Sequence, residues 1–521
     1  MLARFLALFT VPPHTLFRTS MISAFANTWR VPELRDRILF TLAMIIIVRL
    51  GVHITLPGVD AALIDEWTRH MAKGDGGAGN PLSAMLTVFS GGALQQAGIF
   101  ALGIMPYISA SIMIQLMTAV VPKLSKLSRE EGGRQKITQW TRYLALFIAL
   151  VQGYFLVASL THPETLRGIM SGIEQVMRGR SLVPDPSFAW HAIALLTIVS
   201  GTMLLMWIGD QMTERGIGNG VSIIIMVNII SGLPGALVIA WKQFTTGVDV
   251  NPFIALKLVF MLAFLVFVIA AVISITQAQR RITVQYAKRV VGKKQFGGQT
   301  QYLPLKVNYS GVMPIIFVSA ALSLPAIMLT WFAKGQPWAA KWSSALAMGG
   351  WAYYALGAVG IFFFSYFWVA TMFQPMQIAE DLKRNSGYIP GVRPGKPTGE
   401  FLDFTMTRLT FAGAIFLTLI FVLPTGVGLL MDIQQGSPIL QFFGGTSLLI
   451  LVGVVLDVMR QVETHLLQRH YDGFLRKGKL KGRYDRLAQT GNAASSTVLV
   501  YLWVVIAILT VIGASAWIWH K

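Results

Sequence analysis

The sequence has 521 residues, of which 54% are apolar and only 13% are charged, and 43 Lys and Arg against 23 Asp and Glu give a formal net charge of +20. A soluble protein carries roughly 25% charged residues, so this composition excludes the soluble globular and disordered classes. The absence of cysteine excludes disulfides, thiolate catalysis and Cys-ligated metal sites. Several stretches exceed the ~18 apolar residues of a membrane span. The sequence therefore predicts an all-α protein that crosses a membrane many times.

Hydropathy in windows of about 19 residues predicts ten spans and an eleventh near the end of the chain. They lie near 38–56, 98–121, 143–160, 188–208, 221–241, 253–276, 311–331, 351–373, 409–423, 446–459 and 496–519. With a cytoplasmic N-terminus, the cytoplasmic segments hold 32 Lys and Arg and the opposite side holds 10. Short basic loops stay inside, so the N-terminus is expected in the cytoplasm. The eleventh span then leaves the C-terminus outside, with a re-entrant or in-plane helix as the alternative.

Two cytoplasmic loops differ from ordinary connectors. Residues 277–310 hold seven basic and no acidic residues, and the alternation of Ile282, Val284 and Tyr286 predicts a strand or hairpin. The other loop, 374–408, contains SGYIPGVRPGKPTGEF (386–401), which is rich in Pro and Gly and predicts a turn instead of a helix. Contact with lipid headgroups is one interpretation of the basic loops. Docking of an anionic partner, such as ribosomal RNA or an acidic protein face, is the other.

The predicted membrane interior is poor in ionisable residues. Ion-coupled transporters keep such residues within their spans, whereas here Arg49 is expected at the outer end of the first span, where its side chain can reach the interface. The sequence also lacks recognisable catalytic motifs. GVRPGK (Gly391–Lys396) is too short for a phosphate-binding loop, and GIGNG (Gly216–Gly220) precedes a span instead of a βαβ helix. We expect neither an enzyme nor a cofactor.

A short apolar segment before the second span is interrupted by two glycines. Residues 81–98 read PLSAMLTVFSGGALQQAG, with the break at Gly91 and Gly92. The segment is too short to cross, and non-helical backbone at membrane depth needs protein or a water-filled cavity around it. We therefore expect a re-entrant element of a pore; an interfacial amphipathic helix is the alternative.

Several motifs resemble the SecY family, the channel subunits of the bacterial Sec protein translocase. The two longest are GIFALGIMPYISASIMIQLM (98–117) and WIGDQMTERGIGNGVSIII (207–225). KVNYSGVMPIIF, GVRPG, MTRLT and FGGTSLLI follow in the family's order, and the likeness covers about residues 31–485. Relative to the family the chain begins about twenty residues early, which makes Met21 an alternative start, and carries the extra segment 496–519.

The resemblance implies two pseudo-symmetric, inverted five-helix halves around a central pore, with one further C-terminal span. The corresponding divisions are 1–30 as a cytoplasmic segment, 31–250 as the first half with a plug at 81–97, 251–466 as the second half, 467–495 as a basic segment and 496–519 as the added span. A lateral gate between the second and seventh spans would release membrane proteins into lipid. The resemblance further implies the subunits SecE and SecG, the motor ATPase SecA, the ribosome, signal sequences and lipids as partners, and the bacterial inner membrane as location.

The resemblance also assigns site residues. Six β-branched aliphatic residues match the family's constriction and are called here the pore-ring residues: Ile104, Ile108, Val221, Ile225, Ile316 and Ile450. A ring of such side chains dewets when empty and so blocks ions. Gly91 and Gly92 match the plug hinge, and Gln115, Gln152 and Asn308 match polar positions of the lateral gate. The matching docking residues for the ribosome or SecA are Arg280, Arg281, Lys288, Arg289 and Arg393.

Three functions remain to be compared. A protein-conducting channel fits the pore-ring residues, the plug and the basic loops together. A secondary transporter with discontinuous helices is the main alternative, against which the scarcity of intramembrane charges argues. A structural scaffold or insertase is the third, but a scaffold needs no constriction. Without the resemblance, the pore-ring residues would be read simply as core or lipid-facing side chains.

Overall fold

The computed structural model describes residues 31–73, 90–130, 132–161, 173–177, 180–245, 254–286, 289–291, 294–296, 300–332, 336–346, 350–431 and 445–476. Ten of its helices overlap the first ten predicted spans. They are α3 (Pro32–Val52), α6 (Met105–Val120), α8 (Gly133–Thr161), α11 (Phe188–Arg215), α12 (Gly220–Thr245), α13 (Ile254–Gln277), α14 (Met313–Phe332), α16 (Trp351–Met372), α18 (Lys396–Met431) and α20 (Gly445–Arg476). Segments 1–30, 81–89 and 477–521 lie outside the described residues, and with them most of the expected plug and the eleventh span.

Four helical stretches of the described chain are long and apolar enough to cross a membrane: Gly133–Thr161, Phe188–Arg215, Trp351–Arg384 and Lys396–Gly428. A fifth results if α6 and the short α7 (Pro122–Arg129) form one span, although a bend of 107° separates them. Helix α3 is not among these stretches, and its first residues, Glu33–Arg37, include four charged side chains. The protein therefore has several helices suited to a membrane, and ten crossings remain a prediction.

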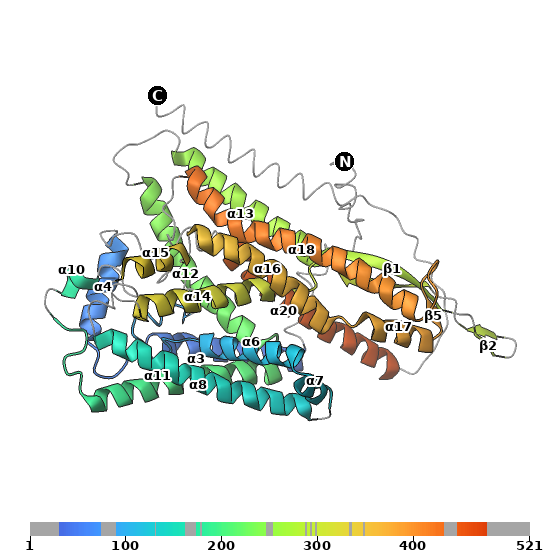
Figure 1. Ribbon diagram of the computed structural model, residues 1–521, viewed down its shortest axis with the longest axis horizontal. Helices are drawn as coiled ribbons and strands as arrows, with labels where there is room; N and C mark the ends of the chain where they lie inside the picture. The colour runs from blue at the N-terminus through green and yellow to red at the C-terminus, as the bar shows by residue number, and fades with distance from the viewer. Residues whose placement is uncertain are drawn as a thin grey trace.

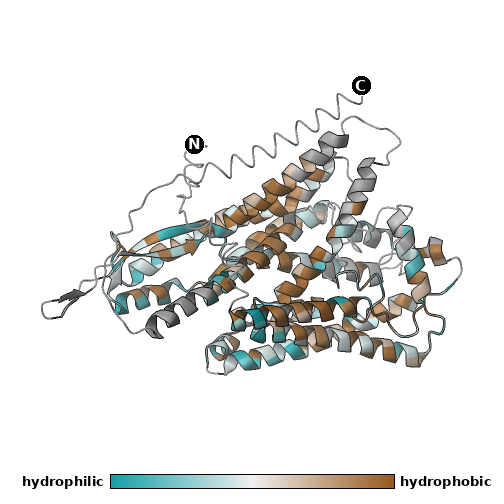
Figure 2. Cartoon of the chain, turned by 180° about the vertical axis from the view of Figure 1, so that it is seen from behind, coloured by the Kyte–Doolittle hydropathy of each residue, from teal (hydrophilic) through white to brown (hydrophobic). Residues whose placement is uncertain are grey.

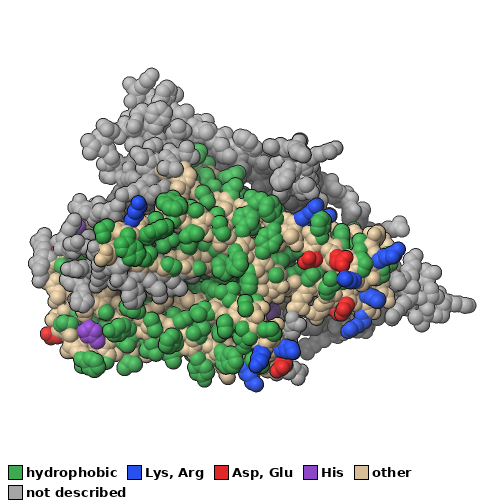
Figure 3. Space-filling model, in the orientation of Figure 1, with side chains coloured by type: hydrophobic (Ala, Val, Ile, Leu, Met, Phe, Trp, Pro, Cys, Tyr) green, Lys and Arg blue, Asp and Glu red, His purple; other side chains and the backbone are tan. Residues whose placement is uncertain are grey.

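Apolar side chains cover the middle of the molecule. In Figure 3 they form a broad surface, while most of the visible charged side chains gather at one end, where α7 and α17 (Pro375–Arg384) lie (Figure 1). Figure 2, which shows the molecule from behind, has mostly hydrophobic residues along the helices of the middle and more hydrophilic residues at the charged end. Large exposed side chains such as Trp351 and Tyr143 are 73% and 71% accessible. A surface of this kind is suited to contact with lipid instead of water.

The ten long helices form two groups with similar neighbours. In the first group α6 contacts α8, α8 contacts α11, α11 contacts α12, and α12 contacts α3. The same order of neighbours recurs five helices further along the chain: α14 contacts α16, α16 contacts α18, α18 contacts α20, and α20 contacts α13. The main contacts between the groups join α12 to α13, α12 to α20 and α6 to α14. Figure 1 shows α3, α8 and α11 on one side and α16 and α18 on the other.

A small sheet lies at the charged end, as the alternation in 277–310 predicts. Strand β1 (Gln279–Tyr286) pairs antiparallel with β4 (Thr300–Lys306) and, at its end, with β5 (Gly387–Tyr388). A separate hairpin joins β2 (Arg289–Val291) to β3 (Lys294–Phe296). Ile282 and Val284 are both buried on one face of β1, as a period of two requires. The other regular elements of the described residues are helices.

The turn predicted for 386–401 is shorter than expected. Helix α18 already begins at Lys396, so the last six residues of that segment are helical. Pro397 is tolerated because the N–H groups of the first helical turn have no partner within the helix. Three short helices lie at the other end of the molecule (Figure 1): α4 (Ala61–Lys73), α10 (Ile173–Met177) and α15 (Pro337–Leu346).

The second predicted span, 98–121, is wrong in its first part. Helix α6 begins only at Met105, and residues 91–104, called here the turn segment, are non-helical. Ala97 and Gly103 have φ of 44° and 57°, which a right-handed helix cannot contain. The backbone of the turn segment forms hydrogen bonds with the residues after α3: Leu56 N donates to Ala97 O and Ile99 N donates to Ile54 O, each at 2.9 Å.

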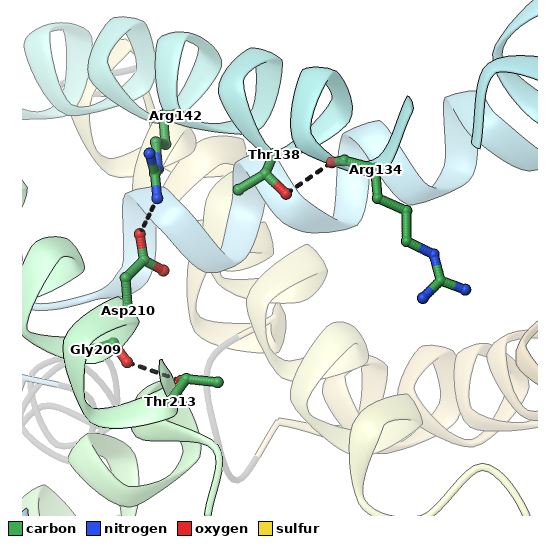
Figure 4. Close-up of polar contacts among 6 residues, drawn as sticks. All are labelled: Arg134, Thr138, Arg142, Gly209, Asp210 and Thr213. Atoms are coloured by element: carbon green, nitrogen blue, oxygen red, sulfur yellow. Dashed lines mark hydrogen bonds and ion pairs between the residues drawn. The ribbon is translucent and has the colours of Figure 1, made fainter. Parts of the chain in front are cut away.

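An ion pair joins α8 to α11 near the charged end. Arg142 Nη2 lies 2.6 Å from Asp210 Oδ2 (Figure 4). The Asp210 side chain is 21% exposed and that of Arg142 43%, so solvent weakens the attraction. Thr138 and Thr213 bond the carbonyls of Arg134 and Gly209 one turn earlier in their own helices (Figure 4). The pair aligns two neighbouring helices of the first group.

Gly201 provides a test of how the turn segment is packed. A Cβ at Gly201 of α11 would overlap the Ile99 carbonyl oxygen and lie 3.0 Å from its carbon, whereas nothing lies within 4 Å of a Cβ at Gly232 of α12. We expect Gly201→Ala to destabilise the protein by about 1–3 kcal/mol through overpacking. Gly232→Ala should be neutral or stabilising by up to about 1 kcal/mol. The midpoint of thermal unfolding in detergent measures both, and equal midpoints would contradict the packing described here.

Candidate functional site in the shared helix core

The six pore-ring residues meet in one apolar cluster. Five of them are at most 6% exposed and belong to its buried centre, and Val221 packs against it partly buried. Four helices contribute: Ile104 and Ile108 come from the start of α6, Val221 and Ile225 from α12, Ile316 from α14 and Ile450 from α20. Two of these helices belong to each five-helix group. The cluster therefore lies where the two groups meet.

Local structure explains why these side chains converge. Ile104 caps helix α6, and the other five residues lie within the first six positions of their helices. Ile104 and Ile108, like Val221 and Ile225, are four apart and share a helical face. Each is β-branched and has few rotamers in a helix. The four helix starts thus present stiff aliphatic side chains to a common centre.

The turn segment packs against the same cluster. Ala93 is fully buried within it. Gly91 and Gly92 have φ of 63° and 92°, a region that glycine adopts without strain. Arg49, expected at the outer end of the first span, lies in the last turn of α3, and its Nη1 donates to the Gly91 carbonyl at 3.1 Å. No local pattern in the sequence signals this contact, because the two residues are 42 positions apart.

The three amides expected at the lateral gate lie on or next to α6, α8 and α14, and α6 contacts both of the other helices. Gln115 is on α6 and Asn308 precedes α14, and these two helices are in contact; Gln152 is half-buried on α8. Gln115 donates to Ser111 Oγ at 3.2 Å, and Asn308 donates to the Gly311 carbonyl at 3.0 Å. These two amides therefore bond within their own segments.

The residues expected to dock cytoplasmic partners lie at the charged end of the molecule. Arg280 and Arg281 are exposed on β1, opposite Leu305 and Pro304 of β4. Arg393 is exposed on the turn between β5 and α18, and its carbonyl accepts a bond from Thr398 Oγ1 at 2.8 Å. The pairing of β1 with β5 holds the two segments together. Lys288 lies outside the described residues, and for Arg289 only its backbone position in β2 is described.

A basic side chain beside this sheet is electrostatically perturbed. Burial lowers the pKa of the Lys306 ammonium, the nearby Arg460 lowers it further, and Asp457 opposes both. Lys306 ends β4, while Asp457 and Arg460 belong to α20. Desolvation and a like charge disfavour the protonated form, and an opposite charge favours it. The sheet and the middle of α20 therefore share one electrostatic environment.

The Gly-rich loop between α11 and α12 links helices that are distant in sequence. The N–H of Gly218 donates to Gln461 Oε1 of α20 at 2.7 Å, and the N–H of Ile217 donates to Thr41 Oγ1 of α3 at 3.2 Å. Sequence analysis only excluded a dinucleotide site here. It had no signal for these partners, which lie 243 and 176 residues away. The loop thus joins the start of α12 to both helix groups.

The chemistry of the described residues is that of packing and hydrogen bonding. Their buried polar side chains are Ser, Thr and Asn. Among the described residues, no group of three His, Cys, Asp or Glu could hold a metal ion. The site is therefore a hydrophobic cluster with an adjacent non-helical turn.

Comparisons with known proteins agree with these features. A family model described as SecY matches residues 98–459. The chain is 41% identical over 461 residues to protein translocase subunit SecY of Streptomyces galbus, covering 88% of this chain and 100% of that protein. It is 41% identical over 455 residues to the Escherichia coli K12 protein of the same name, covering 86% and 96%.

Solved structures share the fold. One described as a protein conducting channel has a TM-score of 0.54 at 15% identity and covers 86% of this chain and 95% of that chain. A second, whose description concerns the plug domain of the SecY protein, has a TM-score of 0.51 at 16% identity with the same coverage. The family model matches more than half of the sequence, and the relatives match over nearly their full length. The chain belongs to the SecY family.

Proposed function

We propose that this chain is the channel-forming subunit of a protein translocase, a conduit that passes unfolded preproteins across a membrane and releases membrane proteins sideways into lipid. One observation carries the proposal: six aliphatic side chains from four helices of both groups pack in one buried cluster. Relatives named protein translocase subunit SecY support it. The chain supplies a passage instead of a chemical reaction.

The pore-ring residues explain how such a passage stays closed to ions. Aliphatic side chains offer no hydrogen bonds to water, so a narrow ring of them dewets when empty. Their contacts are dispersive and non-directional, so a passing chain can displace them without breaking specific bonds. The near-complete burial of Ile104 and Ile450, at 0% and 5% exposure, fits a closed resting state.

The lateral gate is assigned to the contact between α6 and α14. It is one of the main contacts between the two groups, and on the proposed topology its helices are the second and seventh spans. Because Gln115 and Asn308 bond within their own segments, opening the seam breaks neither of these bonds. Gln152 on the neighbouring α8 completes the polar set.

The two five-helix groups are proposed as inverted halves, divided near residue 250. The recurrence of the same neighbour pairs five helices later supports this division. An odd number of crossings per half starts the second half on the opposite side of the membrane. The plug is proposed at 81–97, with its hinge at Gly91 and Gly92, whose positive φ values suit a sharp change of direction.

The partners and location follow from the family. We propose SecE and SecG as further subunits, and SecA and the ribosome as cytoplasmic partners at Arg280, Arg281, Lys288, Arg289 and Arg393. One solved relative of the fold is described as a yeast Ssh1 complex bound to the 80S ribosome, with a TM-score of 0.50. The location is the bacterial inner membrane with a cytoplasmic N-terminus, and 496–519 crosses outward as an extra span.

A secondary transporter is the alternative function. It would place ionisable side chains at a midplane site. The cluster between the groups consists of apolar side chains, and the buried polar residues of the described chain are uncharged. These features favour the channel.

The first prediction concerns the constriction. Replacing Ile104 or Ile450 with Asn adds a hydrogen-bonding amide that wets it, so the resting ion conductance of reconstituted channels should rise severalfold. Preproteins with weakened signal sequences should also be exported better. Leu196→Asn adds the same amide at a position of α11 that is 63% exposed and should leave both readouts unchanged. Wild-type conductance and signal stringency in both ring variants would show that these residues form no constriction.

The second prediction concerns docking. Arg393 is exposed on its turn, and a guanidinium binds carboxylates in a two-pronged geometry that an ammonium cannot copy. Arg393→Glu should abolish translocation driven by SecA in inverted vesicles, and Arg393→Lys should reduce it. Abundance of the chain and assembly with its subunits should stay normal.

A control separates a local contact from net charge. Arg384→Glu makes the same reversal at another exposed residue, in the last turn of α17, and should have little effect on translocation. Normal translocation by the Arg393→Glu variant, or its loss from the membrane, would contradict a docking role.

A further inference from the structure

Arg49 contacts the expected plug hinge from the last turn of α3. Its Nη1 donates to the carbonyl oxygen of Gly91 at 3.1 Å. Helical residues on both sides, Val48 and Val52, are each 2% exposed and belong to the apolar cluster, as does Ala93 of the turn segment. The guanidinium is therefore held at the edge of the cluster by its own helix, half-buried and directed at the hinge.

Asn228 contacts the same glycine from another helix. A Cβ added to Gly91 would lie 2.8 Å from Asn228 Cγ and 3.2 Å from Arg49 Nη1, whereas nothing lies within 4 Å of a Cβ on Gly92. Asn228 is 5% exposed and follows Ile225 by three residues of α12, so the two side chains lie on one helical face. The hinge thus sits directly beside a pore-ring residue, between two polar side chains.

The contact with Arg49 is of a strong kind. A hydrogen bond with a charged donor is stronger than a neutral one, and breaking it in a buried setting leaves the partner unsatisfied. The carbonyl of Gly91 belongs to backbone that leaves helical geometry, so it needs a partner from another segment. Arg49 supplies one.

We propose that Arg49 is a positioning residue that latches the plug hinge in the closed channel, by holding the Gly91 carbonyl against the face of α12 that carries Asn228 and Ile225. The inference rests on the proposed function, since it treats 81–97 as the plug. With the proposed topology α12 runs outward, so Asn228 lies on the external side of Ile225, where a plug has to sit. Displacement of the plug then requires release of the Arg49 bond.

The test uses the absence of cysteine from the chain. Ser90, beside the hinge, is 4% exposed, so a Ser90→Cys variant carries a single, protected thiol. In the assembled complex in vesicles, Arg49→Met should raise the rate of its labelling by a membrane-impermeant maleimide by about tenfold, the effect of losing one charge-assisted hydrogen bond. Resting ion conductance should rise as well.

Arg37→Met is the matched control. It removes an exposed charge from the first part of the same helix and should leave labelling and conductance at the parent values. Should Arg49→Met fail to accumulate, Arg49→Gln replaces it, because its shorter amide does not reach Gly91. Parent labelling rates in the folded Arg49 variant would overturn the latch.

A glycine pair tests the other side of the hinge. Gly91→Ala and Gly92→Ala both place alanine at positive φ, but only the first meets Asn228. Gly91→Ala should expose the thiol more than Gly92→Ala does, and Asn228→Ala should remove the difference. Equal labelling of the two alanine variants would contradict the packing of the hinge against α12.

The result separates the latch from the channel itself. If Ile450→Asn raises conductance while Arg49→Met changes neither readout, the latch fails and the channel stands. If Arg49→Met exposes the thiol but neither variant changes conductance, the contact with the hinge is supported and the proposed channel fails.

Discussion

Within a membrane every backbone N–H and C=O group must find a partner inside the protein. Helices meet this requirement by themselves, which is why the long apolar stretches are helical. The turn segment, 91–104, does so only in part: turn bonds such as Ala97 N to Leu94 O lie within it, and other bonds join it to the residues after α3 and to Arg49. The helix α6 therefore begins late, at Met105, and its first turn brings Ile104 and Ile108 into the apolar cluster. Where the backbone leaves the helix thus decides where the proposed constriction lies.

The same constraint links the proposed constriction to the turn segment, which includes the proposed plug hinge. Asn228 and Ile225 share a face of α12. Gly91 packs against Asn228, and Ala93 belongs to the same apolar cluster as Ile225. A chain that separates the aliphatic side chains also disturbs the contacts of the turn segment. Opening of the ring and release of the plug are therefore expected to depend on one another, with the α6 and α14 seam as the side that moves.

Hydropathy was sufficient to locate the ten long helices, because burial in lipid imposes a length and a composition that few other constraints override. It misplaced the start of α6, because the positive φ values of Ala97 and Gly103, which end helical geometry there, leave no mark in hydropathy. The strands of 277–306 followed from their alternation, whereas Lys396–Phe401 looked like a turn because Pro and Gly are also accepted in a first helical turn. Pairings over long separations, such as Arg142 with Asp210 and Gln461 with Gly218, leave no periodic signal. The pore-ring residues were found through family motifs, and their convergence in one cluster is a property of the fold.

The central claim is that the pore-ring residues surround the path of a translocating chain. Single cysteines can be placed at each of the six positions, and at three lipid-facing positions, Leu196, Val359 and Leu419, which are 63%, 69% and 57% exposed. A preprotein carrying one cysteine and stalled in transit is then oxidised against each variant. The account predicts disulfide cross-links at the pore-ring positions and none at the lipid-facing ones. Cross-links at the lipid-facing positions with none at the pore-ring positions would contradict it.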